Sequence, residues 1–263
     1  MNMNGKQIGT VFAVFAISAF AGQVSADDLR QIMAPTGTLR IGVYPGSPTS
    51  EIRDRSGEVH GLTVEIGEEL GRRLGVGTQL VEFRRPAEVV DAITAGQADV
   101  TVTNATAARA EKIAFTQPLL ALELGFLVPA TSKVQNPSDL DNAERRVGVT
   151  QGGTSERTIR ETLKKAMIVP VPTLQAASDM LRDGGLDAYA TNKPVLFELS
   201  DSLPGARVLD GRWGLEHLAI GYPKGREIAA SRLEQFGMEI RRSGFLTKAA
   251  ERAGLRGQVP EEH

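Results

Sequence analysis

The order of apolar and polar positions along the chain predicts alternating strands and helices. Short apolar or alternating runs indicate strands, and apolar residues at near-helical spacing indicate helices between them: strands at 38–44, 78–83 and 98–103, helices at 64–74 and 86–95. Glycines follow both helices, where a left-handed residue commonly ends a helix. This part of the chain therefore predicts a three-stranded α/β unit.

A second unit of the same kind follows. Its strands are expected at 146–149, 168–171 and 188–191, and its helices at about 156–166 and 176–182. Two longer apolar runs, at 121–129 and 218–225, flank this unit and are typical of extended strands that cross between units. Helical periodicity over 226–253 follows the second crossing.

These elements predict an α/β fold with two lobes. Each lobe is expected to be a mostly parallel sheet flanked by helices, and two extended crossings join the lobes in place of one flexible linker. Lobe one is expected to contain residues 27–122 and 218–263, and lobe two residues 123–217. Ligands of such a protein lie in the cleft between the lobes.

The first 26 residues form a separate segment. Lys6 precedes an apolar run over 8–21, and Val24-Ser25-Ala26 provides small residues before Asp27. This pattern is typical of a secretory signal peptide, and the run is shorter than the roughly 20 apolar residues of a membrane span. A retained membrane anchor is the alternative. We expect residues 1–26 to be removed and the mature protein to be located in the periplasm.

Composition excludes several classes of function. The chain has no cysteine, which excludes a disulfide framework and a lipid-attachment cysteine. Its formal net charge of −2 and its lack of basic runs argue against nucleic acid or anionic membranes as partners. The three histidines share no metal-ligand spacing, and no nucleophile motif or phosphate loop is present. We therefore expect no metal, no cofactor and no catalytic residue.

Polar residues with a recognisable chemistry stand where the predicted strands end. Asn104 and Arg109 follow the strand at 98–103, and ligands bind at strand ends in open α/β sheets. The planar guanidinium of Arg109 is suited to gripping a carboxylate at two points. A solvated arginine at the start of a helix is the alternative interpretation.

Equivalent positions occur in the second unit. Thr154 and Ser155 lie between a strand and a helix, where backbone N–H groups attract anions, although a plain helix cap needs the same residue types. Asn192 follows the strand at 188–191, and asparagine is also a common turn residue. Tyr44, at the end of the first strand, has a ring that could stack on a ligand or pack at the rim of a site.

Jointly, these motifs resemble periplasmic solute-binding proteins of the amino-acid type, the bacterial extracellular solute-binding proteins of family 3. The matching segments are Leu39-Arg40-Ile41-Gly42-Val43, the run from Gly57 to Ile66, Ala98-Asp99-Val100 through Arg109 to Pro118, the run from Val147 to Ser155, and Leu186-Asp187-Ala188. The resemblance implies the receptor component of an ABC importer. Such a protein is expected to be a monomer that closes around a small solute with a carboxylate and delivers it to an inner-membrane permease.

The resemblance also assigns roles to site residues. It implies that Arg109 holds the α-carboxylate of the ligand with help from Asn104, and that Thr154 and Ser155 add carboxylate-binding N–H groups. Asn192 stands where the family usually has an aspartate for the α-ammonium group. This replacement weakens the cation-binding half of the site, because a charge-assisted bond of about 1.5–3 kcal/mol becomes a neutral one. The expected ligand is therefore an amino acid, a modified amino acid or an organic acid.

Two other functions stay open. The first is an enzyme on the same scaffold, because periplasmic cyclohexadienyl dehydratases resemble this family. Such an enzyme needs a general acid or base in the cleft, for which Glu51 and Glu65 are the loose candidates. The second is the sensor domain of a signalling receptor, which would need a further module after Leu255, where the sequence offers a short tail. We favour a binding protein without enzymatic activity.

Overall fold

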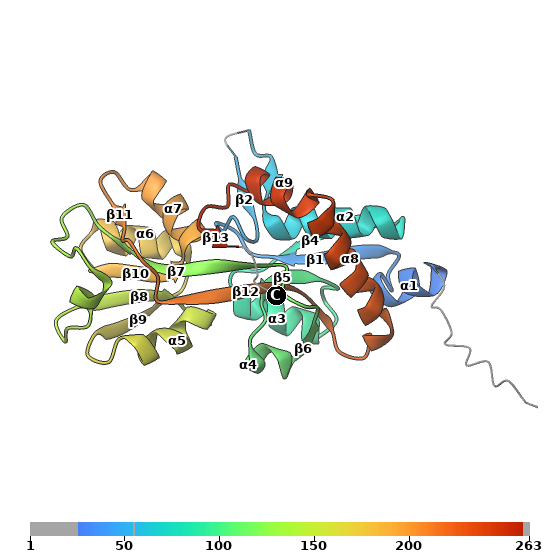
Figure 1. Ribbon diagram of the computed structural model, residues 1–263, viewed down its shortest axis with the longest axis horizontal. Helices are drawn as coiled ribbons and strands as arrows, with labels where there is room; N and C mark the ends of the chain where they lie inside the picture. Colours follow the sequence, from blue (N-terminus) through green and yellow to red (C-terminus); the bar gives the residue numbers. More distant parts are fainter. Residues whose placement is uncertain (1–25, 55, 260–263) are drawn as a thin grey trace, which may run out of the picture.

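The computed structural model describes residues 26–54 and 56–259 of the 263-residue chain. The predicted signal peptide therefore lies outside the described residues, apart from Ala26. Within the described part, no helix combines the length and the apolar character that a membrane crossing requires. The described residues form two α/β lobes joined by two long strands, which confirms the predicted fold class (Figure 1).

One lobe is built from the first part of the chain and from its C-terminal helices. Strands β4, β1 and β5 lie parallel in that order, and the link from β1 to β5 includes a bridge between Ile41 and Val100. The elements of this lobe are α1 (Ala26–Met33), β1 (Thr38–Val43), β2 (Ile52–Arg53), β3 (Val59–His60), α2 (Leu62–Leu74), β4 (Gly77–Glu82), α3 (Pro86–Thr94), β5 (Thr101–Asn104), α4 (Ala107–Ala110), β6 (Ile113–Phe115), the 3-10 helix η2 (Glu227–Ala229), α8 (Ala230–Arg242) and α9 (Phe245–Arg252).

The other lobe repeats this plan. Strands β9, β8 and β10 lie parallel in that order, so both lobes have the order second, first, third strand. Its elements are the 3-10 helix η1 (Pro137–Leu140), β8 (Arg146–Thr150), α5 (Thr154–Thr162), β9 (Met167–Val171), α6 (Leu174–Arg182), β10 (Ala188–Asn192), α7 (Lys193–Ser202) and β11 (Arg207–Val208).

The two crossings are β7 (Leu120–Val128) and β12 (Gly214–Pro223). They pair antiparallel with each other, from Gly214 opposite Leu124 to Leu218 opposite Leu120. β12 continues alongside β5 in the first lobe, and β7 continues alongside β10 in the second. The short strand β13 (Gln258–Val259) also pairs with β7. The predicted lobe boundaries, 122/123 and 217/218, fall inside these strands, and their positions remain a prediction.

Each lobe has its own hydrophobic core. In the first lobe α2 buries one apolar face against β1, β4 and β5, and α8 and α9 extend the same core. In the second lobe α5 covers one face of the sheet, while α6 and α7 cover the other (Figure 1). The sheet of the second lobe is therefore covered on both faces, as near-continuous apolar strands require, whereas β4 at the edge of the first lobe has no fully buried residue.

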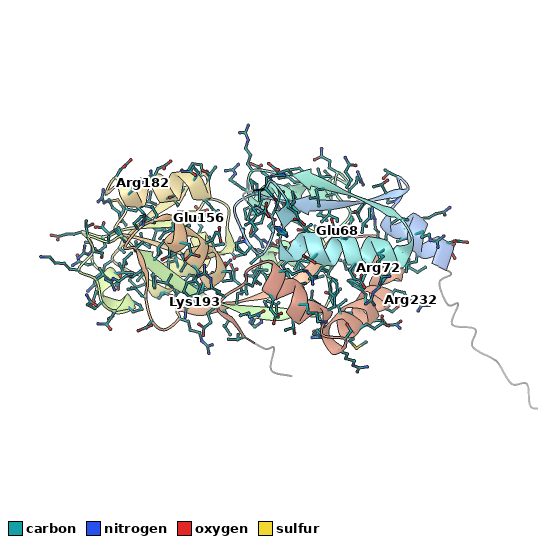
Figure 2. All side chains as sticks on the ribbon, turned by 90° about the horizontal axis from the view of Figure 1, so that it is seen from above. Glu68, Arg72, Glu156, Arg182, Lys193 and Arg232 are labelled. Atoms are coloured by element: carbon teal, nitrogen blue, oxygen red, sulfur yellow. The ribbon has the colours of Figure 1, made fainter. Side chains whose placement is uncertain are left out.

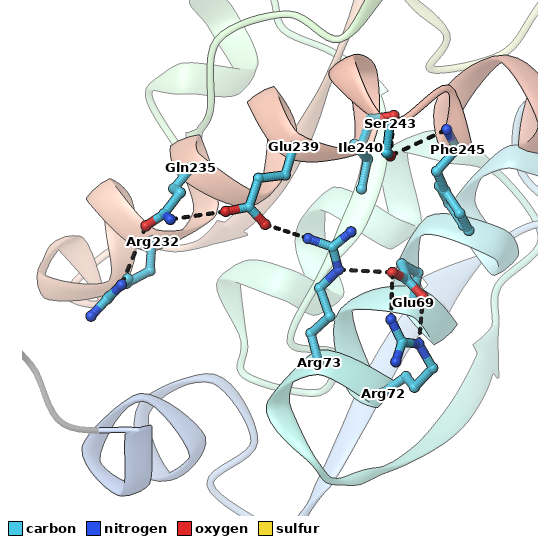
Figure 3. A network of polar contacts seen from close by, with 9 residues as sticks. All are labelled: Glu69, Arg72, Arg73, Arg232, Gln235, Glu239, Ile240, Ser243 and Phe245. Carbon is cyan, nitrogen blue, oxygen red and sulfur yellow. Dashed lines mark hydrogen bonds and ion pairs between the residues drawn. The ribbon is translucent and has the colours of Figure 1, made fainter.

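Charged residues cover the outer faces of the helices. Figure 2 shows Glu68 and Arg72 along α2 and Arg182 at the end of α6. Some of these residues also join helices: Arg73 on α2 contacts Glu69 at 2.7 Å and Glu239 on α8 at 2.5 Å (Figure 3). This network ties α8 to α2 across the surface of the first lobe.

The main element that the sequence analysis missed is α7. The sequence leaves Asn192 open between a ligand-binding residue and a turn residue before Lys193-Pro194, because asparagine is common in turns. In the structure Pro194 lies in the first turn of α7, where its missing N–H costs little, and Asn192 caps the helix by accepting a hydrogen bond from Val195 N at 3.2 Å. The same residues thus start a helix.

Candidate ligand-binding site

A cavity of about 500 Å³ lies between the two lobes. It is lined by residues at the carboxyl ends of all six parallel strands, three from each lobe: Tyr44 after β1, Glu82 in β4, Asn104 in β5, Thr150 in β8, Pro172 after β9 and Asn192 in β10. The six residues predicted as a ligand site, Tyr44, Asn104, Arg109, Thr154, Ser155 and Asn192, all line this one cavity. Their roles in binding remain predictions.

Arg109 provides the cation of the cavity. It lies on α4, which Thr106 caps from its side chain, and its Nη1 donates to Thr103 Oγ1 at 2.6 Å and to Asn104 O at 3.3 Å. Burial lowers the pKa of the guanidinium below its usual value, although arginine stays charged. No carboxylate among the described residues forms an ion pair with Arg109, so its remaining N–H groups are available to an anion.

Glu216 provides a carboxylate that the sequence analysis did not identify. Glu216 lies on β12, is 7% exposed and lines the cavity. Thr154 Oγ1 donates to Oε1 at 2.6 Å and Asn192 Nδ2 donates to Oε2 at 3.0 Å. A carboxylate has about four acceptor positions, so two bonds leave room for a donor from a ligand. The cavity therefore has a buried carboxylate, which lies on a crossing strand and not at position 192.

The Thr154 side chain, at the start of α5, bonds Glu216 and does not cap its own helix. Gly153 occupies the N-cap, without a side-chain cap bond, so Thr154 and Ser155 are the first two helical residues. Thr154 Oγ1 accepts from Asn104 Nδ2 at 3.2 Å while it donates to Glu216, which links the two lobes through one hydroxyl. Ser155 is buried at the cavity wall. The first N–H groups of a helix lack intrahelical acceptors and can bind an anion.

Asn192 lines the cavity and uses both ends of its side-chain amide. Its Oδ1 caps α7, as a turn-type asparagine would, and its Nδ2 reaches Glu216. Asn104 is the corresponding residue of the first lobe, at the end of β5: its Oδ1 accepts from His217 N at 3.0 Å. The two asparagines therefore hold adjacent residues of β12 from opposite lobes.

The Tyr44 ring forms part of the wall on the side of the first lobe. Its hydroxyl donates to Ser47 Oγ at 3.4 Å and lies 3.3 Å from Thr49 Oγ1. Burial raises the pKa of the phenol, and the charges of Glu216 and Arg109 act on it in opposite directions. The charge of Glu216 also acts on Arg109, where it opposes the lowering of the pKa by burial. The three side chains thus share one electrostatic environment although no ion pair joins Arg109 to Glu216.

The two carboxylates suggested as catalytic candidates do not line the cavity. Glu65 pairs with Arg252 of α9 on the surface of the first lobe. Glu51 is buried in that lobe, 2.6 Å from Arg53, and its burial raises the pKa of the carboxyl. Glu216 is therefore the buried carboxylate among the cavity-lining residues that the structure describes.

One cluster could in geometry hold a metal ion, outside the cavity. Asp54, Glu58 and His60 in the β2–β3 hairpin have ligand atoms within 4.8 Å of one another. Asp54 already accepts hydrogen bonds from Ser56 and from the Glu58 backbone, which fold the turn. The cluster lies largely in solvent and has no further feature of a metal site.

Three further contacts bring the lobes together across the cleft. Arg85 Nη1 donates to Gln151 Oε1 at 3.0 Å. Leu174 of the second lobe lies against Gly46, and Ala87 lies so close to Gly152 that a Cβ there would be 2.9 Å away. Both glycines have positive φ values, 83° and 72°, which other residues rarely adopt. The lobes are thus in direct contact around the cavity.

Residues 39–254 match the family model of bacterial extracellular solute-binding proteins, family 3, and the chain belongs to that family. The family expected from the sequence motifs is therefore confirmed.

Individual relatives agree with this assignment. The histidine-binding periplasmic protein of Salmonella typhimurium is 30% identical over 120 residues, and the chain spans just under half, 45%, of that relative's length. The solute receptor for L-cysteine of Neisseria gonorrhoeae has a TM-score of 0.76 and 23% identity, over 86% of this chain and 92% of that one. An ancestral amino acid-binding protein, a precursor of cyclohexadienyl dehydratase, has a TM-score of 0.75 and 24% identity, over 86% and 99%. Both of these solved structures share the fold of this chain.

Proposed function

We propose that the protein is a periplasmic binding protein that captures an α-amino acid between its lobes and delivers it to an ABC permease. The observation that carries this proposal is the pair of charges in the cavity: Arg109 and Glu216 line the same cavity, Glu216 is buried and Arg109 is half-buried, and the two do not pair with each other. A zwitterion satisfies both, because its carboxylate meets the guanidinium and its ammonium meets the carboxylate. Relatives named for histidine and L-cysteine support the same class of ligand.

The neutral residues around these charges orient them. In this proposal Asn104 and Thr154 connect the lobes, Ser155 and the start of α5 add N–H donors beside the ligand carboxylate, and Tyr44 forms the wall beneath the ligand. Asn192 holds Glu216 in place by its hydrogen bond. An uncompensated buried charge is costly, so each charge favours the ligand group of opposite sign.

The lobes are proposed to close by bending of β7 and β12, near residues 122/123 and 217/218. Crossing strands are a common place for hinges, since few residues there absorb the rotation. In this proposal the ligand contacts both lobes. The hydrogen bond between Asn104 and Thr154 also joins the two lobes. The protein is proposed to act as a monomer after removal of the signal peptide.

Calorimetry with the twenty L-amino acids and with matched analogues tests this proposal. For the tightest amino acid, we expect the amine that lacks the carboxylate and the acid that lacks the ammonium to bind at least ten times more weakly. Glu216→Gln should weaken the amino acid far more than the acid without an ammonium. If that organic acid bound as tightly as the amino acid to the wild type, an organic-acid receptor would replace the proposal.

A second candidate function rests on the same carboxylate. A buried carboxyl group close to a carboxylate anchor is the general acid or base that a cyclohexadienyl dehydratase-like enzyme would need. Incubation of the purified protein with prephenate or arogenate distinguishes the two functions. A binding protein gives no turnover, whereas turnover that disappears in Glu216→Gln would establish the enzyme.

A further inference from the structure

The cavity extends well beyond the residues that hold the α-groups. The strand order shows in which direction the cavity extends from these residues. In the first lobe β5 lies beside the crossing strand β12, whereas β4 is the far edge. In the second lobe β10 lies next to the crossing strand β7, and β9 is the far edge. Glu216 and Asn104 therefore mark the crossing side of the cavity, and Glu82 and Pro172 mark the edge side, where a ligand side chain would lie.

Neutral side chains predominate between these two sides. Leu174, at the start of α6, and Val195 and Leu199, on α7, are apolar residues of the second lobe. Ser178 and Thr191 are buried hydroxyl residues of the same lobe. A Cβ at Gly46 of the first lobe would lie 3.4 Å from Leu174, so this apolar wall reaches the first lobe across the cleft.

Charged residues of the cavity wall fall into two groups. Glu216 is buried and Arg109 is half-buried, whereas Glu82, Arg84 and Glu198 are exposed. The exposed Glu82 also lies 3.3 Å from Arg53. Exposed ion pairs contribute about 0–1 kcal/mol, so these three residues offer little compensation for a charge inside the cavity.

We propose that the ligand's side chain is uncharged and at least as large as that of leucine. This inference rests on the proposed function, in which the α-carboxylate and the α-ammonium of the ligand use Arg109 and Glu216. A third charge on the ligand would enter a region of Leu174, Val195 and Leu199 without a buried partner, which is unfavourable. The volume of about 500 Å³ is several times the roughly 150 Å³ of an engineered cavity that holds benzene, so small side chains leave much of it to water.

Isosteric pairs of amino acids test the charge of the side chain directly. Calorimetry would compare glutamine with glutamate, and citrulline with arginine, because each pair differs mainly in charge. We expect the uncharged member to bind at least ten times more tightly in both pairs, and leucine to bind more tightly than alanine.

Each opposite result has a defined meaning. Equal or tighter binding of arginine overturns the inference in favour of a cation held by Glu82 and Glu198. Equal or tighter binding of glutamate overturns it in favour of the neighbouring cavity of about 410 Å³, whose lining includes Arg157 and Lys112. Absence of binding by every amino acid overturns the proposed function and this inference with it.

A variant of the apolar wall provides an independent readout. Leu174→Glu places a carboxylate in the region proposed for the side chain and should shift the citrulline-to-arginine preference towards arginine by at least tenfold. Met167→Glu, on the exposed face of β9, adds the same charge to the outside of the same lobe and should leave the preference unchanged. An unchanged preference in a folded Leu174→Glu protein would overturn the placement of the ligand side chain.

Discussion

Asn192 Nδ2 donates a hydrogen bond to Glu216 Oε2 at 3.0 Å, while Asn192 Oδ1 accepts one from Val195 N. The amide is therefore used at both ends, once for the helix and once for the carboxylate. An aspartate could accept the helix cap bond, but it has no hydrogen to donate to Glu216. The amide at position 192 and the carboxylate at position 216 fit each other as a pair.

This relationship predicts the effect of Asn192→Asp. Two carboxylates would then lie about 3 Å apart in a partly closed site, where like charges repel strongly. We expect ligand affinity measured by calorimetry at pH 7.5 to fall at least tenfold in Asn192→Asp. The double variant Asn192→Asp, Glu216→Gln again has one carboxylate and one amide at these two positions, with their places exchanged. It should therefore recover a large part of the lost affinity. Tighter binding by Asn192→Asp alone would contradict this account.

Most of the site was predictable because strand ends are visible in the sequence. Asn104 and Asn192 stand at the ends of apolar runs, Arg109 follows on the next helix, and open α/β sheets bring such strand ends to one edge. Glu216 was missed because it lies inside a strand, where an acidic residue usually faces solvent. A signal was present: Leu218, Ile220 and Tyr222 are buried, and side chains two residues apart lie on the same face of a strand.

What sequence could not provide is the contact between segments far apart in the chain. Thr154 has the residue type of a helix cap, and its sequence position gives no reason to expect Glu216 as its partner. That contact requires β12 to pass between the lobes and the start of α5 to face it. Periodicity describes one element at a time, whereas the cavity depends on how six strand ends meet across the cleft.

Arg109 is predicted to be the main anchor for the ligand carboxylate. Arg109→Ala should reduce affinity by about tenfold to about 150-fold, in line with about 1.5–3 kcal/mol for a charge-assisted bond. Arg109→Lys should recover little, because an ammonium group lacks the planar fork and the bond to Thr103 is also lost. The exposed Arg160→Ala on α5 removes the same charge elsewhere and serves as the control. Unchanged calorimetric affinity in Arg109→Ala would contradict the assignment.

Glu69 is predicted to make part of the stability depend on pH. Hydrogen bonds from Arg72 and Arg73 lower the pKa of its carboxyl from 4.5 to about 2 (Figure 3). A lowered pKa in the folded state stabilises the protein above the unfolded pKa, and this contribution is lost as the pH falls from about 4.5 through 2. We expect Glu69→Gln to reduce the free energy of unfolding by about 1–2 kcal/mol at pH 7, after allowance for screening.

The neighbouring Glu68 is the matched control for this prediction. Burial and the nearby Glu65 raise the pKa of Glu68, so its charged form is disfavoured in the folded protein. Glu68→Gln should therefore leave the free energy of unfolding unchanged or slightly higher at pH 7. Urea titrations of both variants at pH 7 and pH 3 measure the difference, and equal losses in the two variants would refute the role of the arginines.

Asp99 is predicted to contribute more to the free energy of unfolding than Asp187, the corresponding carboxylate of the second lobe. It precedes β5 as Asp187 precedes β10, and each accepts a hydrogen bond from the backbone N–H of an arginine in the neighbouring strand, Arg40 or Arg146. The Asp99 side chain is 0% exposed and also binds the guanidinium groups of Arg40 and Arg226 at 2.9 and 3.0 Å, whereas the Asp187 side chain is 22% exposed.

Removal of the charge should therefore have unequal effects in the two lobes. Asp99→Asn leaves two partly buried arginines without their carboxylate and should lower the free energy of unfolding by about 3 kcal/mol. Asp187→Asn affects pairs that water already screens and should cost about 1 kcal/mol or less. Urea unfolding of the ligand-free variants, followed by circular dichroism, provides the comparison. Similar losses in both would show that solvent exposure does not distinguish these two carboxylates, and that the backbone bond they share dominates.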